Sequence, residues 1–255
     1  MRRVAEHAAP FLLIAGLLAF WEAICRALDI PRFFLPPPSE VAAAALSGAA
    51  VLLPSAWITL SMALQALVIA SILACGTALV VSLNGLLEKA VQPIAVALQV
   101  TPVIAIAPQV AIWAGLEHPN RAVVALAVIV AFFPIFSGAL TGLKAADPDL
   151  ERLFDLYGAN RLQRLWRLRM PSAVPFVLEG HKVAGGLAVI GAVVAEFVAG
   201  SGGTQGLAWR IQESAYRYQT ARTFAAVFIL AIMGALLYTA LLYAERLILR
   251  RLRGR

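Results

Sequence analysis

Four stretches of this chain contain no charged residue, and each is long enough to cross a lipid bilayer as a helix. They cover residues 57–83, 91–116, 122–143 and 223–244, whereas about 20 apolar residues are enough to span the hydrocarbon core. Charged residues make up only 14% of the chain, compared with roughly a quarter in soluble domains. The sequence therefore predicts a membrane protein with several spans.

Two further apolar stretches have charged residues in or beside them. Residues 175–199 carry charges only near their two ends, so a fifth span is predicted there. Residues 10–25 follow Arg2 and Arg3, which fits either a first span or a secretory signal peptide. Bulky residues end this run and no clear small-x-small cleavage site follows, which favours a retained helix. We therefore predict an all-α, polytopic membrane protein with six transmembrane helices.

Basic residues are divided unevenly between the two sides that six spans define. Fifteen of the 21 fall at the termini and in the connections on the same side, and 6 fall in the other connections. Because cytoplasmic connections are enriched in Lys and Arg, both termini and the long connection at 144–182 are predicted to be cytoplasmic. Topology thus explains most of the net charge of +7, and no nucleic-acid partner is expected.

The connection at residues 147–171 is too long for a turn and has a helical pattern of its own. In its first part, apolar residues at 150, 153, 154 and 157 have the spacing of one helical face. Gly158 then provides a helix stop, and Asn160 can cap a second piece. The sequence therefore predicts two short amphipathic helices in this connection.

The second of these helices combines an apolar stripe with a row of arginines. Leu162, Leu165 and Trp166 share one face, while arginines at 161, 164 and 167 line another. Met170-Pro171 is expected to end the helix. Such a surface fits either a partner groove with an apolar floor and an acidic rim, or an anionic bilayer surface. The pattern alone leaves both alternatives open.

Three prolines interrupt the apolar run at 91–116. Inside a membrane they free backbone carbonyls, which must be satisfied by protein or by a water-filled cavity. We predict a kinked helix lining a solute path, with a purely packing role for the kinks as the alternative. Glu196 lies near the outer end of its span, where it either faces the path or has a simple interfacial position. The candidate path residues are Gln99, Thr101, Pro102, Gln109 and Glu196.

Several motifs typical of enzymes are missing from the sequence. There is no G-x-x-x-x-G-K-[ST] phosphate loop, so ATP hydrolysis by that route is not expected. H-E-x-x-H and G-x-S-x-G are also missing. Both cysteines lie in apolar stretches and the three histidines are scattered, which indicates neither a disulfide framework nor a metal site. We therefore expect neither enzymatic activity nor a cofactor or metal bound by this chain.

The cytoplasmic connection resembles a known signature. Gly158, followed after nine residues by Leu168-Arg169-Met170-Pro171, is similar to the G-x9-I-x-L-P part of the signature loop of ABC-importer permeases. FLPPPS at 34–39, TPVIAIAP at 101–108 and VVAE at 193–196 resemble the nitrate/sulfonate/taurine branch of that family. There is one departure: where the signature often begins Glu-Ala-Ala, this chain has Arg, Leu and Phe at 152–154.

The resemblance implies a type I ABC-importer permease fold and a set of partners. These are a second copy of the chain, two ABC ATPase subunits that bind ATP and Mg, and a periplasmic or lipid-anchored solute-binding protein. The segment at about 155–169 would be the coupling helix, which favours a protein groove over lipid as its contact. The implied ATPase-docking residues are Asp155, Tyr157, Gly158, Ala159, Asn160, Arg161, Leu162, Leu165, Trp166, Leu168 and Pro171.

The expected function is that of a permease subunit in a bacterial inner membrane. It would import a small solute such as a sulfonate, taurine, nitrate or a pyrimidine precursor by alternating access, driven by separate ATPases. The alternative is an ion-coupled secondary transporter without ATPase partners, against which the scarcity of ionisable residues within the spans argues. The expected organisation is an N-terminal helix with an external connection at 1–50, a five-helix core at 51–250 with the coupling loop at 144–171, and a basic cytoplasmic tail at 251–255.

Overall fold

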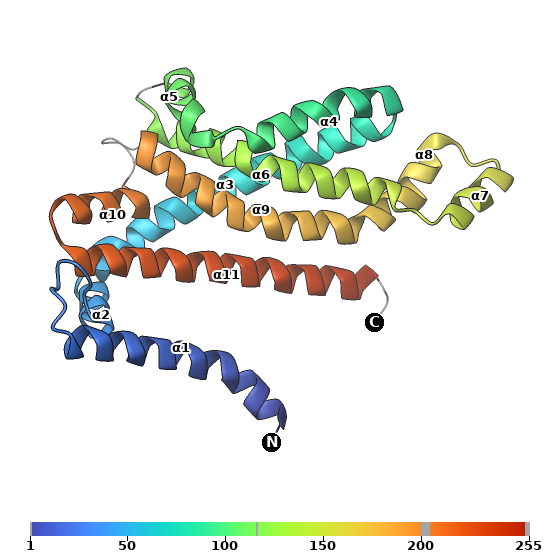
Figure 1. The fold of residues 1–255 in the computed structure, drawn as a ribbon. Coiled ribbons are helices and arrows are strands. Elements are labelled where there is room, and N and C mark those ends of the chain that lie inside the picture. Colours follow the sequence, from blue (N-terminus) through green and yellow to red (C-terminus); the bar gives the residue numbers. More distant parts are fainter. Residues whose placement is uncertain (1, 116, 200–204, 253–255) are drawn as a thin grey trace. The chain divides into compact units, whose positions relative to one another are not determined.

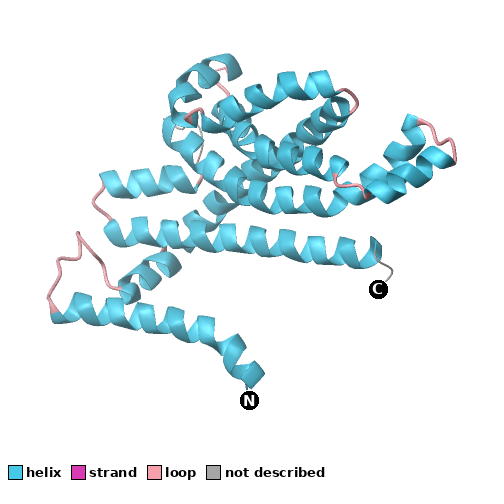
Figure 2. Cartoon of the chain, turned by 45° about the vertical axis from the view of Figure 1, so that its right-hand side comes forward, coloured by secondary structure: helices cyan, strands magenta, loops and turns pink. Residues whose placement is uncertain are grey.

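The computed structural model describes residues 2–115, 117–199 and 205–252, and within these ranges every regular element is a helix (Figure 1, Figure 2). The predicted all-α class is therefore confirmed. The chain divides into two compact units. The first unit contains residues 1–57 and 205–231, and the second contains residues 58–204 and 232–255.

Aromatic and polar contacts join the helices of the first unit. Trp21 lies with its ring centroid 5.8 Å from that of Phe224 and 5.9 Å from that of Phe228. The carboxylate of Glu22 accepts hydrogen bonds from the backbone N–H of Ser39 at 3.0 Å and from its hydroxyl at 2.8 Å. The unit consists of α1 (Arg2–Ala27), α2 (Pro38–Ser47), the start of α3 (Ala49–Ser82), α10 (Leu207–Tyr216) and the start of α11 (Thr220–Leu252).

The second unit is built around the close packing of two long helices, α6 (Pro119–Lys144) and α9 (Met170–Ala199). A Cβ atom at Gly138 would lie 2.7 Å from the carbonyl oxygen of Phe176, and one at Gly180 would lie 2.6 Å from that of Pro134. Glycine therefore allows the two backbones to approach, as small residues do between membrane helices. The unit also contains α4 (Gly85–Val100), α5 (Val103–Ala114), α7 (Pro148–Leu156), α8 (Arg161–Arg164), η1 (Leu165–Arg169) and the remaining parts of α3 and α11.

Several helices are long and apolar enough to cross a membrane. In the described part of the chain these are α3, α6, the segment Arg161–Val198 and α11. The predicted first span lies within α1, and the predicted third span is covered by α4 and α5. The helices thus agree with the prediction of a multi-pass membrane protein.

The third predicted span is two helices rather than the single kinked helix that we expected. Between them, Thr101 and Pro102 have extended backbone conformations. Proline has no N–H to donate and disfavours helical geometry in the residue before it. The helix therefore breaks at Pro102, whereas Pro93 and Pro108 lie inside α4 and α5.

Candidate functional site

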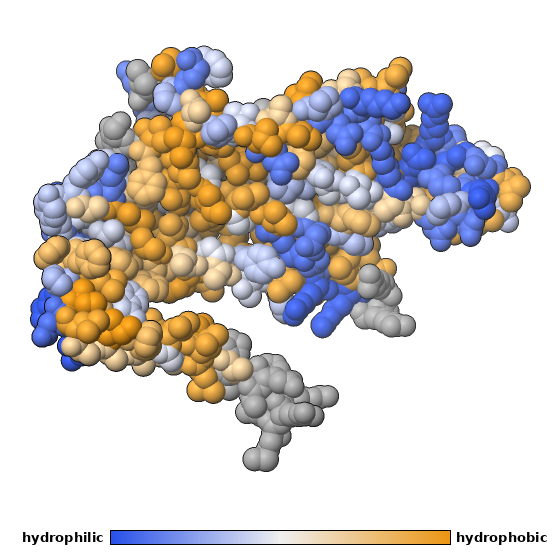
Figure 3. All heavy atoms as spheres, in the orientation of Figure 1, coloured by the Kyte–Doolittle hydropathy of each residue, from blue (hydrophilic) through white to orange (hydrophobic). Residues whose placement is uncertain are grey.

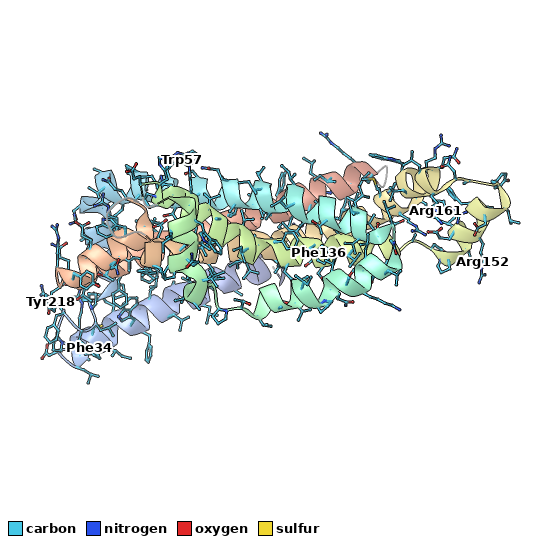
Figure 4. The ribbon with its side chains drawn as sticks, turned by 90° about the horizontal axis from the view of Figure 1, so that it is seen from above. Phe34, Trp57, Phe136, Arg152, Arg161 and Tyr218 are labelled. Atoms are coloured by element: carbon cyan, nitrogen blue, oxygen red, sulfur yellow. The ribbon has the colours of Figure 1, made fainter. Side chains whose placement is uncertain are left out.

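The candidate docking segment lies in the connection between α6 and α9, which extends beyond the ends of those helices (Figure 1). It consists of α7, the short α8 and η1. Arg152 on α7 and Arg161 on α8 lie at this end of the second unit (Figure 4). Figure 3 shows hydrophilic residues gathered over the same elements, with hydrophobic residues at the outermost edge of the connection. Both predicted pieces of the connection are helical.

Local hydrogen bonds fix the ends of these two pieces. Asp147 caps α7 by accepting a hydrogen bond from the backbone N–H of Asp149 at 2.8 Å. Gly158 has a φ of 65°, a left-handed conformation that glycine adopts without strain, and it lies in the turn between α7 and α8. Asn160 and Gln163 form a capping box at the start of α8, with distances of 2.8 and 2.9 Å. The predicted stop and cap are thus confirmed.

The second piece continues directly into α9, so the expectation that Met170-Pro171 ends it is wrong. Residues 165–169 form a π-helical turn, in which the N–H of Met170 donates to the carbonyl oxygen of Leu165. Pro171 is the second residue of α9, directly after the π turn. The docking segment and α9 therefore form one continuous helical path.

Six large apolar side chains are exposed in this connection, and four of them are at least 60% exposed. At the end of α7, Leu156 is 85% exposed and Tyr157 is 83% exposed. In the second piece, Leu162 is 63% exposed and Trp166 is 60% exposed. We name these four residues the apolar tip. Exposed apolar clusters of this kind mark contact sites for proteins or membranes.

The predicted apolar stripe of the second piece is divided between the surface and the core. Leu165 is buried, as is Leu168, so Leu165 does not share an exposed face with Leu162 and Trp166. The π turn has a wider helical repeat than an α-helix, which shifts side chains from the positions that an α-helical pattern predicts. Of the other expected docking residues, Ala159 is half-buried, and Asp155, Gly158, Asn160, Arg161 and Pro171 are exposed.

The arginines that were predicted to form one row also differ in their exposure and contacts. The guanidinium of Arg164 pairs with the carboxylate of Asp155 and donates to the carbonyl oxygen of Ala159 at 3.3 Å. Arg164 therefore stabilises the turn between α7 and α8. Arg161 and Arg167 are exposed and remain available to an acidic partner.

Four of the five predicted path residues lie around the break between α4 and α5. Gln99, Pro102 and Gln109 are exposed on the second unit, and Thr101 is half-buried. The hydroxyl of Thr101 donates to the carbonyl oxygen of Ala97 at 2.6 Å. The structure thus brings these four residues to one region, and their contact with a solute stays a prediction.

Glu196, the fifth predicted path residue, differs from the other four in its burial. Its side chain is fully buried, and its carboxylate accepts a hydrogen bond from the hydroxyl of Thr59 at 2.6 Å. This contact joins α9 to α3 within the second unit. In this conformation Glu196 supports helix packing, and a lining or gating role stays a prediction.

A groove of about 880 Å³ between α3, α5 and α6 was missed by the sequence analysis. Its lining is mainly apolar, and Trp113 contributes a side chain that is 76% exposed. Polar groups are supplied by Gln65 on α3 and by Asn120 and Arg121 at the start of α6. The signal was an indole near the end of the third predicted span, followed by an amide and a guanidinium in the connection after it, to which we assigned no role. The predicted path residues are not among those that line this groove.

The described residues offer no set of ligands for a metal ion, because no group of three His, Cys, Asp or Glu side chains is suitably placed. They do form a bundle of apolar helices. The connection between α6 and α9 projects from this bundle and carries polar residues together with the apolar tip. Such a protein belongs to the class of polytopic membrane proteins.

Comparison with known proteins gives the family. Residues 66–254 match the family model described as "binding-protein-dependent transport system inner membrane component". The chain belongs to this family, whose members are the permease subunits of ABC importers.

Several relatives match nearly the whole chain. The formylaminopyrimidine transport permease protein ThiX of Halalkalibacterium halodurans is 32% identical over 253 residues, covering 98% of each chain. The riboflavin transport system permease protein RibX of Chloroflexus aurantiacus is 33% identical and covers 92% of this chain and 86% of its own. The taurine transport system permease protein TauC of Escherichia coli is 27% identical, with coverages of 91% and 86%.

A solved structure supports the fold. A crystal structure of an amino acid ABC transporter with histidines covers 81% of this chain and 96% of its own, with a TM-score of 0.63 and 15% identity. At this identity the likeness concerns the fold alone.

The family assignment settles the coarse function. The chain is a transmembrane permease subunit of an ABC importer for a small solute, and it is a transport subunit rather than an enzyme. It works in the inner membrane with ATPase and solute-binding partners, and the ATP is used by the ATPases. This assignment replaces the alternative of a secondary transporter that works without ATPase partners.

Proposed function

We propose that two copies of this subunit form a path for a small heterocyclic solute, driven by ATPases that dock on the apolar tip. The observation that carries the proposal is the apolar tip, whose four large side chains are each at least 60% exposed on a polar connection outside the long apolar helices. An apolar surface beside the exposed Arg161 and Arg167 suits a groove with an apolar floor and an acidic rim.

The expected docking residues divide into two roles under this proposal. Tyr157, Leu162 and Trp166 would contact the ATPase directly, because their side chains are exposed. Gly158 and Asn160 would shape the turn that presents them, because they supply the left-handed residue and the helix cap. Buried Leu165 and Leu168 would anchor the segment to the helices.

Substitution of the apolar tip tests the docking proposal. The double variant Leu162→Glu/Trp166→Glu is expected to reduce co-purification of the ATPase subunits about tenfold or more, since central apolar anchors dominate interface energies. The matched control is Leu86→Glu/Leu87→Glu, which places the same two charges at exposed leucines at the start of α4, outside the docking segment. Equal recovery of the ATPases with both variants would contradict docking at the tip.

The proposal of a homodimer rests on the open surface around the break between α4 and α5. Gln99, Pro102 and Gln109 expose polar and proline side chains there, and a second copy facing them would enclose a path. Gln109→Cys, in a chain with Cys25 and Cys75 replaced by Ser, is expected to form a cross-linked pair of subunits in membranes. Recovery of one copy of this chain with a different permease subunit would contradict the homodimer.

The lining of the groove at Trp113 supports the proposal that the solute is a planar organic molecule. Its apolar walls and indole suit a ring, and the amides of Gln65 and Asn120 can hydrogen-bond to ring nitrogens or carbonyl groups. The relatives named for formylaminopyrimidine and riboflavin, at 32 and 33% identity, agree with this class. The solute-binding partner is therefore expected to melt at a higher temperature with a formylaminopyrimidine than with taurine. Stabilisation by taurine or nitrate alone would contradict a heterocyclic solute.

The proposed orientation places both termini in the cytoplasm. It is supported by the division of basic residues into 15 on that side and 6 on the other. Residues 1–50 then form a first helix with an external connection, residues 51–250 form the core, and residues 251–255 form a cytoplasmic tail. A reporter enzyme that is active only in the periplasm, fused to the C-terminus, is expected to be inactive, and activity would reverse the orientation.

A further inference from the structure

The carboxylate of Glu151 on α7 lies between two arginines of the helical path that leads into α9. One of its oxygens accepts a hydrogen bond from Nε of Arg169 at 2.7 Å. Its other oxygen lies 3.9 Å from a guanidinium nitrogen of Arg164. Arg164 is the residue just before the π-helical turn, and Arg169 is the last residue of that turn. Glu151 therefore bridges the two ends of the π turn from a different helix.

This bridge is continuous with the turn that carries the apolar tip. Arg164 also pairs with Asp155, one helical turn after Glu151, and donates to the backbone at Ala159. The side chains of Glu151, Arg164 and Arg169 are 22%, 26% and 38% exposed, so all three are partly sheltered from water. The ion pairs join α7, α8 and η1 into one block.

The π turn that Glu151 bridges is important for the transmission of motion along the helical path. A π turn has less regular hydrogen bonding than an α-helix, and such turns are frequent at functional sites and hinges. Here the π turn carries Trp166 of the apolar tip and connects the other three tip residues to α9 along the chain. A displacement of Leu162 reaches α9 along the backbone only through residues 165–169. A flexible π turn would absorb that displacement.

The acid in this bridge is not at the position that the family signature suggests. The signature begins with Glu at the place of Arg152, which here is 78% exposed and pairs with Asp149, three residues before it on the same helix. Glu151, one residue earlier, faces the second piece of the connection instead. The chain thus has an acidic residue in contact with the π turn even though the usual position carries a base.

We infer that Glu151 is a positioning residue for energy coupling: by holding both ends of the π turn, it makes the apolar tip and α9 move together. This inference rests on the proposed docking of ATPases at the tip. It adds that the link between docking and the membrane helix is an ion-pair bridge within this chain. Glu151 itself does not contact the ATPase.

A spectroscopic measurement on the assembled complex tests the bridge. A spin label is attached at Ile190→Cys, a 57% exposed position on α9, with Cys25 and Cys75 replaced by Ser. In the otherwise unchanged complex, trapping ATP with vanadate is expected to alter the spectrum of the label. In Glu151→Gln this alteration is expected to fall about two- to fivefold, the scale of one partly exposed ion pair, while the ATPases still co-purify.

Companion variants separate positioning from general structure. Arg169→Gln is expected to lose as much of the spectral response as Glu151→Gln, and the double variant no more than either, because both break the same bridge. Arg169→Lys keeps the charge and is expected to restore most of the response. The matched control is Asp149→Asn, which removes an acid from α7 that pairs with Arg152 and does not touch the π turn.

Each outcome has a distinct meaning. Equal responses of Glu151→Gln and Asp149→Asn would overturn the bridge, and so would loss of the ATPases from Glu151→Gln, since Glu151 would then belong to the docking contact. If the apolar-tip variant loses the ATPases while Glu151→Gln responds normally, the docking proposal stands and this inference fails. If the apolar-tip variant keeps its ATPases, or the unchanged complex shows no response to ATP, the docking proposal fails as well.

Discussion

Glu196 and Thr59 form a buried polar contact between two membrane helices, with a distance of 2.6 Å between their side-chain oxygens. Glu196→Ala removes this buried hydrogen bond, and a hydrogen bond to a charged group contributes about 1.5–3 kcal/mol. We therefore expect a lower melting temperature for purified Glu196→Ala. Glu196→Gln keeps a side-chain oxygen that can accept the same hydrogen bond and is expected to melt close to the natural chain.

These two variants also separate packing from charge. If Glu196 serves only the contact with Thr59, Glu196→Gln keeps most of the ATP-driven uptake. If the charge of Glu196 takes part in gating, Glu196→Gln loses uptake at unchanged stability. Equal melting temperatures for Glu196→Ala and the natural chain would contradict the structural role.

At the scale of single residues, local sequence patterns predicted which residues lie in turns and caps. They did not predict which distant residues these side chains contact in the fold. The positions of Gly158 and Asn160 in a turn followed because glycine and asparagine have local conformational reasons to be there. The burial of Glu196 against α3 depends on a residue 137 positions away, and no local pattern contains that information. The groove at Trp113 left a local signal in residues 113–121, but its walls come from three separate helices, so its shape was not predicted.

The packing of α6 against α9 leads to a prediction at the scale of helices. Gly180→Ala would place a methyl group 2.6 Å from the carbonyl oxygen of Pro134, so the helices must separate, at a cost of about 1–3 kcal/mol. Gly186 lies on the same helix, and a Cβ there meets nothing within 4 Å. Gly186→Ala is therefore expected to be neutral or to stabilise by about 0.5–1 kcal/mol.

Melting curves of the two purified glycine variants provide the measurement. A drop in melting temperature for Gly180→Ala, but not for Gly186→Ala, is the expected result. Similar values for both variants would show that α6 and α9 are not held at this distance.

An ion pair between α9 and α11 gives a second prediction at this scale. Nζ of Lys182 lies 2.9 Å from a carboxylate oxygen of Glu245, and these side chains are 11% and 13% exposed. Lys182→Met leaves Glu245 without this partner in a sheltered position and is expected to destabilise the protein by about 3 kcal/mol. The double variant Lys182→Met/Glu245→Leu is expected to recover much of that loss in thermal unfolding. A double variant as unstable as the single one would contradict the pairing.

At the scale of elements, apolar run length located most of the long helices. Apolar run length did not predict where a proline or a π turn interrupts the regular α-helix. Pro102 divides the third predicted span because proline forces Thr101 out of helical geometry. In the opposite sense, Pro171 does not end a helix, because it follows a π turn at the start of α9. A π turn leaves no mark in apolar periodicity, so the burial of Leu165 was not predicted.

The molecule as a whole is a passive path for a solute, and ATPase subunits outside this chain drive the transport. The sequence has no phosphate loop, and its family uses separate ATPases. The purified subunit is therefore expected to show no ATP hydrolysis, and its complex with the ATPases is expected to hydrolyse ATP. The control is a complex in which the ATPase carries an inactivating substitution in its own phosphate loop, and activity that persists there would contradict the account.

Hydrogen exchange of the backbone amides tests docking of the ATPases on the apolar tip without any substitution. The exchange of peptides covering residues 156–166 is compared between the permease alone and the complex with its ATPase subunits. Docking at the tip predicts strong protection of these peptides in the complex, with little change at the connection between α5 and α6. Unchanged exchange at the tip, together with protection elsewhere on the subunit, would contradict it.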